Sequence, residues 1–275
     1  MLWGVAMLAM LAAALQELTV SSWRLESRAE HAAFAEAALD AAVNRAVVGI
    51  SDPHMERRWR VDGVPRDFAF AGVPIRVAIQ DDLGLVNLNM ADASLIRQLL
   101  KTAGSKPDDA DALTDKIIDW RSKELVPRLH GATDADYRAQ GYHYHQRHGP
   151  FQSVDELKLV MGMTPALFAQ MAPVLTVQGR SSAPDPTTSP RIALLALNND
   201  DHAFVDAWLA RRMRERITPD DLPTAVPPGV VDPMAPLAGR SFTITAQIKI
   251  DRRTFVRQAD VEFSDKRPYF FLDWR

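Results

Sequence analysis

The sequence has 275 residues, of which 47% are hydrophobic and 24% are charged, and its formal net charge is −3. That length suffices for one large or two modest globular domains, and the lack of a basic surplus argues against a nucleic-acid-binding protein. The chain contains no cysteine, which excludes disulfides, zinc–thiolate sites and cysteine nucleophiles.

The first fifty residues predict one long α-helix. No proline interrupts them, and the second half repeats apolar side chains at three- and four-residue spacing, namely Ala35, Leu39, Ala42, Val43, Ala46, Val47 and Ile50. This spacing is typical of one face of a helix. An unbroken helix of fifty residues extends about 75 Å at 1.5 Å per residue.

The apolar run at residues 1–15 predicts a membrane anchor, with Leu2, Trp3, Val5, Met7, Leu8, Met10, Leu11 and Leu15 as its lipid-facing side chains. As a helix, this run covers only about 22 Å of a roughly 30 Å hydrocarbon core. A cleaved signal peptide is the alternative, but the run has no basic segment before it and no small-residue cleavage site after it. We therefore expect the sequence to begin downstream of the true start.

Alternating side chains after Pro53 predict a small antiparallel sheet packed on the second half of the helix. Runs at 59–62, 68–70 and 74–80 alternate, with turns at Asp62-Gly63 and Ala71-Gly72 between them. Residues 81–89 end this sheet in a tight turn. Its acids lack the alternate spacing and terminal glutamate of an EF-hand.

A helical region follows, with helices expected at 94–100, 107–120, 153–161 and 164–173 and a loop at 141–149. Ser153 and Glu156 have the spacing of a capping box, and Thr164-Pro165 that of an N-cap followed by proline. Residues 178–189 are expected to form a linker or long turn, and 218–239 an irregular surface loop.

Further helices are expected at 190–197 and 202–217, and the alternating runs at 241–250, 254–263 and 268–274 predict an antiparallel meander. Strands therefore lie at both ends of the globular part, with helices between them. The simplest fold is α+β, with a large all-helical subdomain inserted into one antiparallel sheet.

Two groups of polar residues could carry chemistry. His143, His145 and His148 share one loop, where two histidines at this spacing can bind a metal, but no carboxylate within the loop completes a site. Asp119, Glu124, Asp134 and Asp136 could serve glycoside hydrolysis or hold calcium through oxygen atoms, yet they form no complete loop motif. A helix-hairpin-helix for DNA is disfavoured because residues 92–177 are not basic.

Several short motifs occur together between residues 81 and 177. They comprise Asp82, Gly84, Asn87 and Asn89; Asp119, Trp120 and Arg121; Pro150, Phe151, Ser153, Glu156 and Leu157; and Gly162, Met163, Thr164 and Pro165. In this combination the chain resembles the general secretion pathway protein K family, the large minor pseudopilins of type II secretion. Residues 185–190 depart from the family, which often has Asn-x-Asn-Thr-Ala-Pro there.

The resemblance implies a long pilin-like helix packed on an antiparallel sheet, with an inserted helical subdomain of the SAM-like type. It divides the chain into an assembly helix (1–50), the first part of the pilin-like domain (51–90), the inserted subdomain (91–178) and a second helical part with the C-terminal strands (179–275).

The resemblance also implies a non-enzymatic function. The protein would cap the pseudopilus tip with minor pseudopilins I and J, contact other pseudopilins and support export of folded proteins across the outer membrane. The helix would lie in inner-membrane lipid as a single pass, with the body in the periplasm of a Gram-negative bacterium. No cofactor and no nucleic acid is implied; structural calcium is implied without assignable ligands. The alternative is a membrane-anchored periplasmic hydrolase that uses His143 and His145 or the acids from Asp119 to Asp136.

Overall fold

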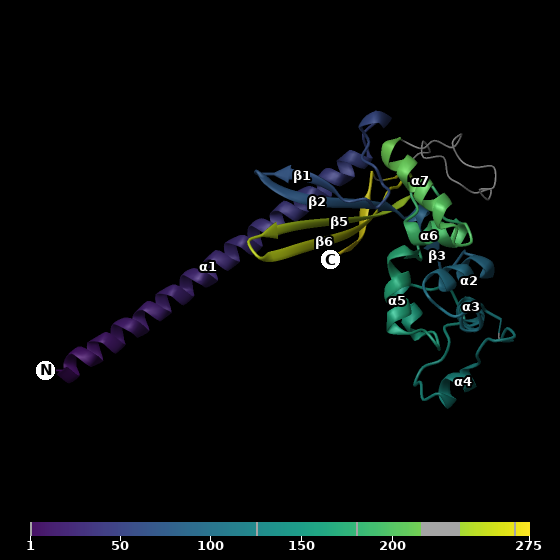
Figure 1. Ribbon diagram of the computed structural model, residues 1–275, viewed down its shortest axis with the longest axis horizontal. Coiled ribbons are helices and arrows are strands. Elements are labelled where there is room, and N and C mark those ends of the chain that lie inside the picture. The colour runs from purple at the N-terminus through teal and green to yellow at the C-terminus, as the bar shows by residue number, and fades with distance from the viewer. Residues whose placement is uncertain (1, 125, 180, 216–236, 267) are drawn as a thin grey trace.

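A computed structural model of the chain describes residues 2–124, 126–179, 181–215, 237–266 and 268–275. The 49-residue helix α1 (Leu2–Ile50) runs unbroken from the N-terminus, and its second half lies along a sheet (Figure 1). The predicted continuous helix is confirmed. Within the described part of the chain, no helix contains a stretch that is both apolar and long enough to cross a membrane.

The sheet has five antiparallel strands in the order β1-β2-β5-β6-β7: β1 (Arg66–Phe70), β2 (Val73–Asp81), β5 (Ser241–Ile250), β6 (Arg253–Glu262) and β7 (Phe270–Trp274). The predicted C-terminal meander is confirmed. Ala71 and Gly72 join β1 to β2 with φ of 48° and 79°, values that match the twist of a tight hairpin. The strand predicted at 59–62 is wrong, because only Asp62 pairs with the sheet, through an isolated bridge to Gln80.

Small residues let α1 lie close to the sheet. Ala35, Ala38, Ala42 and Ala46 are fully buried, and the helix packs on a cluster that includes Ile244 and other inward-facing strand residues. The face predicted from the spacing of apolar residues is therefore the face that is buried. Gly49 is equally constrained, because a Cβ on it would lie 2.5 Å from the Trp59 ring.

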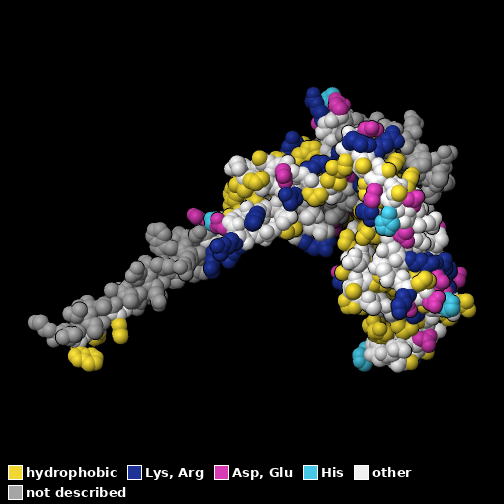
Figure 2. Space-filling model, in the orientation of Figure 1, with side chains coloured by type: hydrophobic (Ala, Val, Ile, Leu, Met, Phe, Trp, Pro, Cys, Tyr) yellow, Lys and Arg dark blue, Asp and Glu magenta, His cyan; other side chains and the backbone are white. Residues whose placement is uncertain are grey.

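The helices between β2 and β5 form a second body beside the sheet, which we call the helical insert (Figure 1). They are α2 (Ala93–Thr102), α3 (Pro107–Arg121), α4 (Asp134–Ala139), α5 (Pro165–Met171), α6 (Arg191–Leu197) and α7 (His202–Arg214), with 3₁₀ turns η2 (Asp82–Gly84), η3 (Val154–Leu159) and η4 (Ala172–Val174). Another 3₁₀ turn, η1 (Met55–Arg57), lies between α1 and β1. The predicted α+β fold with a helical insertion is confirmed. On the face seen in Figure 2, acidic and basic side chains of the insert are interspersed.

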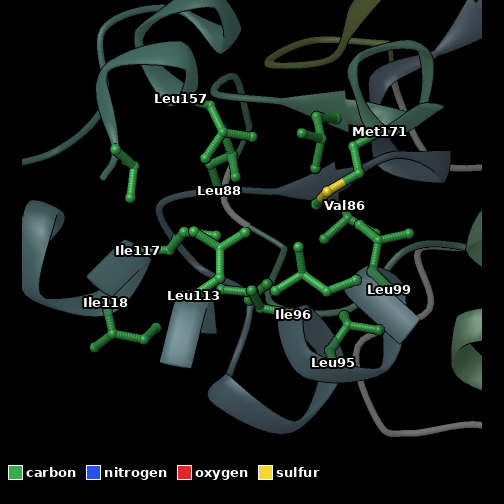
Figure 3. Packing of buried hydrophobic residues seen from close by; sticks show 14 of the residues in the cluster. Val86, Leu88, Leu95, Ile96, Leu99, Leu113, Ile117, Ile118, Leu157 and Met171 are labelled. Atoms are coloured by element: carbon green, nitrogen blue, oxygen red, sulfur yellow. The ribbon is translucent and has the colours of Figure 1, made fainter. Parts of the chain in front are cut away.

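The helical insert has its own hydrophobic core. Leu99, Ile117, Leu157 and Met171 are fully buried within it and come from α2, α3, η3 and α5; Figure 3 shows how several of these side chains converge. Ala193 and Ala196 of α6 also join this core. The core therefore extends past residue 178, where the predicted subdomain ends; the predicted boundaries themselves stay predictions.

A short parallel ladder closes the insert at its base. Strand β3 (Val86–Asn87) pairs with β4 (Leu175–Thr176), with Val86 opposite Leu175 and Asn87 opposite Thr176. Each of these strands has two residues, which is too short for a pattern of alternating apolar and polar side chains to be recognised in the sequence. The part of the insert between β3 and β4 thus begins and ends at neighbouring points of the backbone.

The second half of the segment expected to be a linker or long turn, residues 184–189, is buried. Asp185, Thr187, Thr188 and Ser189 are each less than a tenth exposed. Thr187 donates to Asp185 and the Ser189 hydroxyl donates to the Asp185 carbonyl, whereas the buried Thr188 hydroxyl has no partner among the described residues. Residues 216–236, most of the predicted surface loop, lie outside the described residues.

Candidate functional site

The motif residues of the insert bind one another through side-chain-to-backbone hydrogen bonds. Asn87 Nδ2 donates to the carbonyls of Gln178 (2.7 Å) and Gly179 (3.1 Å), and Asn87 Oδ1 accepts the Asn89 N–H (2.9 Å). One buried amide therefore holds the outgoing and returning strands together. The side chain of Asn87 thus donates two hydrogen bonds and accepts one, a combination that aspartate cannot make because it has no N–H donor.

Asn89 makes a reciprocal pair with Phe151. Its Nδ2 donates to the Phe151 carbonyl at 3.0 Å, and its Oδ1 accepts the Phe151 N–H at 2.7 Å. The Asn89 side chain thus makes the two hydrogen bonds to the Phe151 backbone that a residue of a neighbouring β-strand would make. The first motif of the insert is thereby tied to the third.

Trp120 and Arg121 tie the second motif to the other two. The Trp120 indole is almost fully buried, and its Nε1 donates to Glu156 Oε1 at 3.0 Å. Arg121 donates to the carbonyls of Leu88 and Ala91. Burial lowers the pKa of the Arg121 guanidinium, but its ordinary value is so high that it stays charged.

Glu156 does not form the predicted capping box with Ser153. Ser153 makes no side-chain cap, and η3 is a 3₁₀ turn rather than an α-helix. Instead, Glu156 accepts from Trp120, from Arg147 and from the Gln152 N–H at 2.8 Å. The capping prediction is wrong because a buried indole and a guanidinium are stronger partners for the carboxylate than its own helix end.

The remaining motif residues shape the backbone. Gly162 has φ of 98°, a conformation that favours glycine. Thr164 accepts the Leu167 N–H at 3.2 Å and Pro165 begins α5, which confirms the predicted N-cap. Leu157 is fully buried, whereas Met163 is half-buried against the core and Pro150 is exposed.

Asp82 and Gly84 lie where the chain leaves the sheet. A Cβ on Gly84 would lie 2.7 Å from the Thr188 backbone, so the two crossing segments touch through their main chains. Leu83 accepts the Asp185 N–H at 2.7 Å, and Gln80 donates to the Thr188 carbonyl at 3.0 Å. We call the residues at 80–84, 176–179, 181–189 and 240–243 the junction.

Among its described residues, the junction holds three buried carboxylates and the buried Arg240 guanidinium, and the buried Arg212 guanidinium donates to the Ser189 carbonyl at 2.6 Å. Arg240 donates to Asp81, which also accepts the Leu83 N–H at 2.9 Å. Burial, and then repulsion by Asp81 and Asp260, raises the pKa of Asp82 to about 7. Burial also raises the pKa of Asp185 to about 6. Sequence reasoning placed Asp82 in a motif but missed this cluster, because Asp185 and Arg240 are distant in the chain.

The structure does not assemble the histidines into a site. His143 and His145 are exposed, and His145 Nδ1 contacts the neighbouring Gln146 carbonyl at 2.7 Å. His148 Nε2 lies 3.4 Å from Asp134. Among the described residues, no three histidine or acidic side chains come close enough to hold a metal ion.

Asp119, Glu124 and Asp134 do line one cavity of about 220 Å³, but hydrogen bonds engage these acids and their neighbours. Asp119 accepts the Arg128 N–H at 3.1 Å, Asp134 accepts the Gln146 N–H at 3.1 Å, and Asp136 caps α4 through Thr133 at 2.7 Å. These contacts position loops. The donor set does not fit the six to eight oxygens that calcium requires, and the hydrolase alternative gains no support from it.

Of the predicted anchor residues, the structure describes the side chains of Trp3, Met7 and Met10, which are exposed on α1. The side chains of Leu2, Val5, Leu8, Leu11 and Leu15 lie outside the described residues. This stretch extends beyond the end of the sheet (Figure 1). Its lipid contact stays a prediction.

Comparison with known proteins places the motif network in a family. Residues 80–180 match the family of type II secretion system (T2SS) protein K. The type II secretion system protein K of Klebsiella pneumoniae is 32% identical over 133 residues, which are 44% of this chain and 40% of that protein. The corresponding protein of Dickeya chrysanthemi is 33% identical over 85 residues, 31% of this chain and 23% of that protein.

The matches to these curated relatives thus span two fifths of their length or less. Among solved structures, the fold is similar to a chain in the GspK-GspI-GspJ complex of the enterotoxigenic Escherichia coli type 2 secretion system, with a TM-score of 0.59 and 16% identity over 94% of this chain and 98% of that one. The resemblance drawn from the motifs is confirmed over the residues that carry them.

Proposed function

We propose that this chain, whose residues 80–180 are a type II secretion system protein K domain, is a minor pseudopilin at the tip of the pseudopilus. The observation that carries the proposal is the combination of two parts. An unbroken helix packs on an antiparallel sheet, and the protein K domain is inserted between β2 and β5 of that same sheet.

The long helix supports a role in assembly. Its contacts with the globular body begin at His31, which lies 3.3 Å from Asp251 in the β5–β6 turn, and the part before it projects away from that body (Figure 1). A projecting apolar helix can lie in lipid before assembly and pack with similar helices afterwards. We infer that residues 1–15 anchor the protein in the inner membrane of a Gram-negative bacterium, with the body in the periplasm.

The position of the insert supports a role at the tip. The helical insert lies at the end of the molecule opposite to the N-terminus (Figure 1). A subunit whose N-terminal helix enters a filament would carry this bulk beyond the filament end, where it obstructs further addition. Minor pseudopilins I and J are the proposed partners, and export of folded proteins across the outer membrane is the proposed outcome. The role is structural rather than enzymatic.

Co-purification of the full chain with minor pseudopilins I and J of the same bacterium tests this proposal. Ala37 is exposed on the face of α1 that points away from the sheet. We expect Ala37→Arg to reduce recovery of the complex at least tenfold, because a guanidinium cannot be buried between packed helices without a partner.

Ala203→Arg is the matched control, since Ala203 is equally exposed but lies on α7. It should leave recovery unchanged. Failure of the unaltered chain to bind either pseudopilin would overturn the proposal, as would equal loss in both variants.

A further inference from the structure

Asp82 is a buried carboxylate, and no cationic side chain among the described residues is bonded to it. Its Oδ1 lies 3.4 Å from the Thr243 hydroxyl of β5, and its Oδ2 lies 3.5 Å from the Thr176 hydroxyl of β4. These are long hydrogen bonds, and both come from neutral donors. Asp82 therefore connects the sheet to the returning strand of the insert.

The charges around Asp82 are unbalanced. Asp81 precedes it, Asp260 faces it from β6, and Asp185 lies in the crossing segment of the junction. Among the described residues, the buried Arg240 guanidinium is bound to Asp81, and the buried Arg212 guanidinium donates to the Ser189 carbonyl at 2.6 Å. Arg275 is paired with Asp260 at 3.2 Å and with Asp273 at 2.5 Å. None of these three guanidinium groups is bonded to Asp82.

The hydroxyl of Thr243 cannot satisfy both of its acidic neighbours. It lies 3.0 Å from Asp260 Oδ1 and 3.4 Å from Asp82 Oδ1, but a hydroxyl carries a single proton to donate. If it donates to Asp260, the contact with Asp82 requires a proton on Asp82. The resulting chain runs from the Asp82 O–H to the Thr243 oxygen and from the Thr243 O–H to Asp260.

We propose that Asp82 is a proton-binding latch, which in its neutral form fastens the helical insert to the sheet and in its ionised form releases the junction. With the proton bound, Asp82 donates to Thr243 and accepts from Thr176. Without it, a buried negative charge faces Asp81 and Asp260, and the bond that Asp82 donates to Thr243 is lost, whereas Thr176 can still donate to the carboxylate. Opening of the junction lets water reach the carboxylate and relieves the repulsion.

The direction of the pH effect follows from the proton affinities of the two states. Burial raises the pKa of Asp82 in the closed state to about 7, whereas an exposed aspartate in the open state has a pKa near its ordinary value of about 3.9. Opening therefore becomes roughly tenfold easier per pH unit from about pH 4 to about pH 7, and levels off above. This behaviour does not depend on whether the chain assembles with other pseudopilins.

Amide hydrogen exchange of the full chain at about pH 5.5 and about pH 8.5, corrected for the intrinsic exchange rate, tests the proposal. We expect residues 83–90 and 174–178 to open at least tenfold more often at the higher pH. Asp82→Asn keeps a donor for Thr243 and an acceptor for Thr176 but cannot ionise, so most of the pH dependence should disappear and only the smaller part contributed by Asp185 should remain. An unchanged pH dependence in this variant would overturn the latch.

Asp260→Asn provides an independent readout if Asp82→Asn does not fold. It removes one repelling charge, so the midpoint of the opening transition should move to lower pH. Asp273→Asn is the matched control, because Asp273 shares Arg275 with Asp260 but makes no contact with Asp82. If the pH midpoint of opening is the same in Asp260→Asn and in the unaltered chain, the proposal is wrong.

Discussion

Gly84 is the residue at which the two crossing chains come closest. Its φ is not in the left-handed region, so the need for glycine arises from space: a Cβ would meet the Thr188 backbone at 2.7 Å. We expect Gly84→Ala to lower the free energy of unfolding by about 1–3 kcal/mol, as overpacking does. Urea denaturation of the full chain measures it. Gly149→Ala is the control, since its Cβ would meet only an ordinary contact at 3.9 Å.

Both the N–H donor and the oxygen acceptor of the Asn89 side chain are hydrogen-bonded to Phe151. Asn89→Asp keeps the acceptor for the Phe151 N–H, but it places a second oxygen against the Phe151 carbonyl, where Nδ2 now donates. We expect a loss of about 1–3 kcal/mol from the free energy of unfolding, because a donor is lost and two acceptors face each other.

Thermal or chemical denaturation checks this prediction, with Asn198→Asp as a comparison. Asn198 also donates to a carbonyl, that of Leu194, but it is a helix-capping residue with no second partner across the core. A smaller loss at position 89 than at position 198 would contradict the assigned role.

At the scale of elements, the alanine face of α1 controls how closely the helix approaches the sheet. Ala42 is fully buried and Ala37 is exposed on the same helix. We expect Ala42→Leu to lower the free energy of unfolding by about 1–3 kcal/mol, because added methylene groups force the helix away from β5. Ala37→Leu, at the same helical propensity, should change it little; equal effects would contradict the packing.

The long elements could be predicted from the sequence, and the short ones could not. The helix at 1–50 and the strands at 241–263 carry many repeats of their period, so tertiary contacts did not override them. The run at 59–62 alternates equally well, but Trp59 packs on Gly49 instead of extending the sheet. The pair β3–β4 and the buried segment at 184–189 depend on contacts between residues that are about ninety or more positions apart.

The sequence identified which residues belong to the candidate site, but it did not show which of them bind one another. Trp120, Glu156 and Asn89 were identified from their motifs, yet nothing in the sequence indicated that Glu156 binds Trp120 rather than caps its own helix. The partners of Asp82 were missed for the same reason, because Thr243 and Asp260 follow it by more than 150 residues.

At the scale of the whole molecule, the junction makes stability depend on pH. The pKa values of Asp82 and Asp185 are raised to about 7 and about 6, so the folded state holds protons that the unfolded chain releases. The free energy of unfolding should therefore be greatest near pH 4 to 5 and fall through pH 7. The expected decrease is on the order of 2–4 kcal/mol.

Urea denaturation of the full chain at a series of pH values measures this decrease. Asp185→Asn should flatten the lower part of the curve, up to about pH 6. Stability that rises between pH 5 and 7 would contradict the assigned protonation of the junction.

The two-residue ladder of β3 and β4 also bears on how the length of the insert can change. Because Val86 lies opposite Leu175, the segment between them begins and ends at adjacent points of the backbone, and its further attachments are side-chain contacts such as those of Gln98 and Thr102 with Asp200. Duplications or deletions within that span change the bulk of the insert without shifting the register of β2 against β5. The length of this segment can therefore change without a change in the sheet, provided that its contacts with α6 are kept.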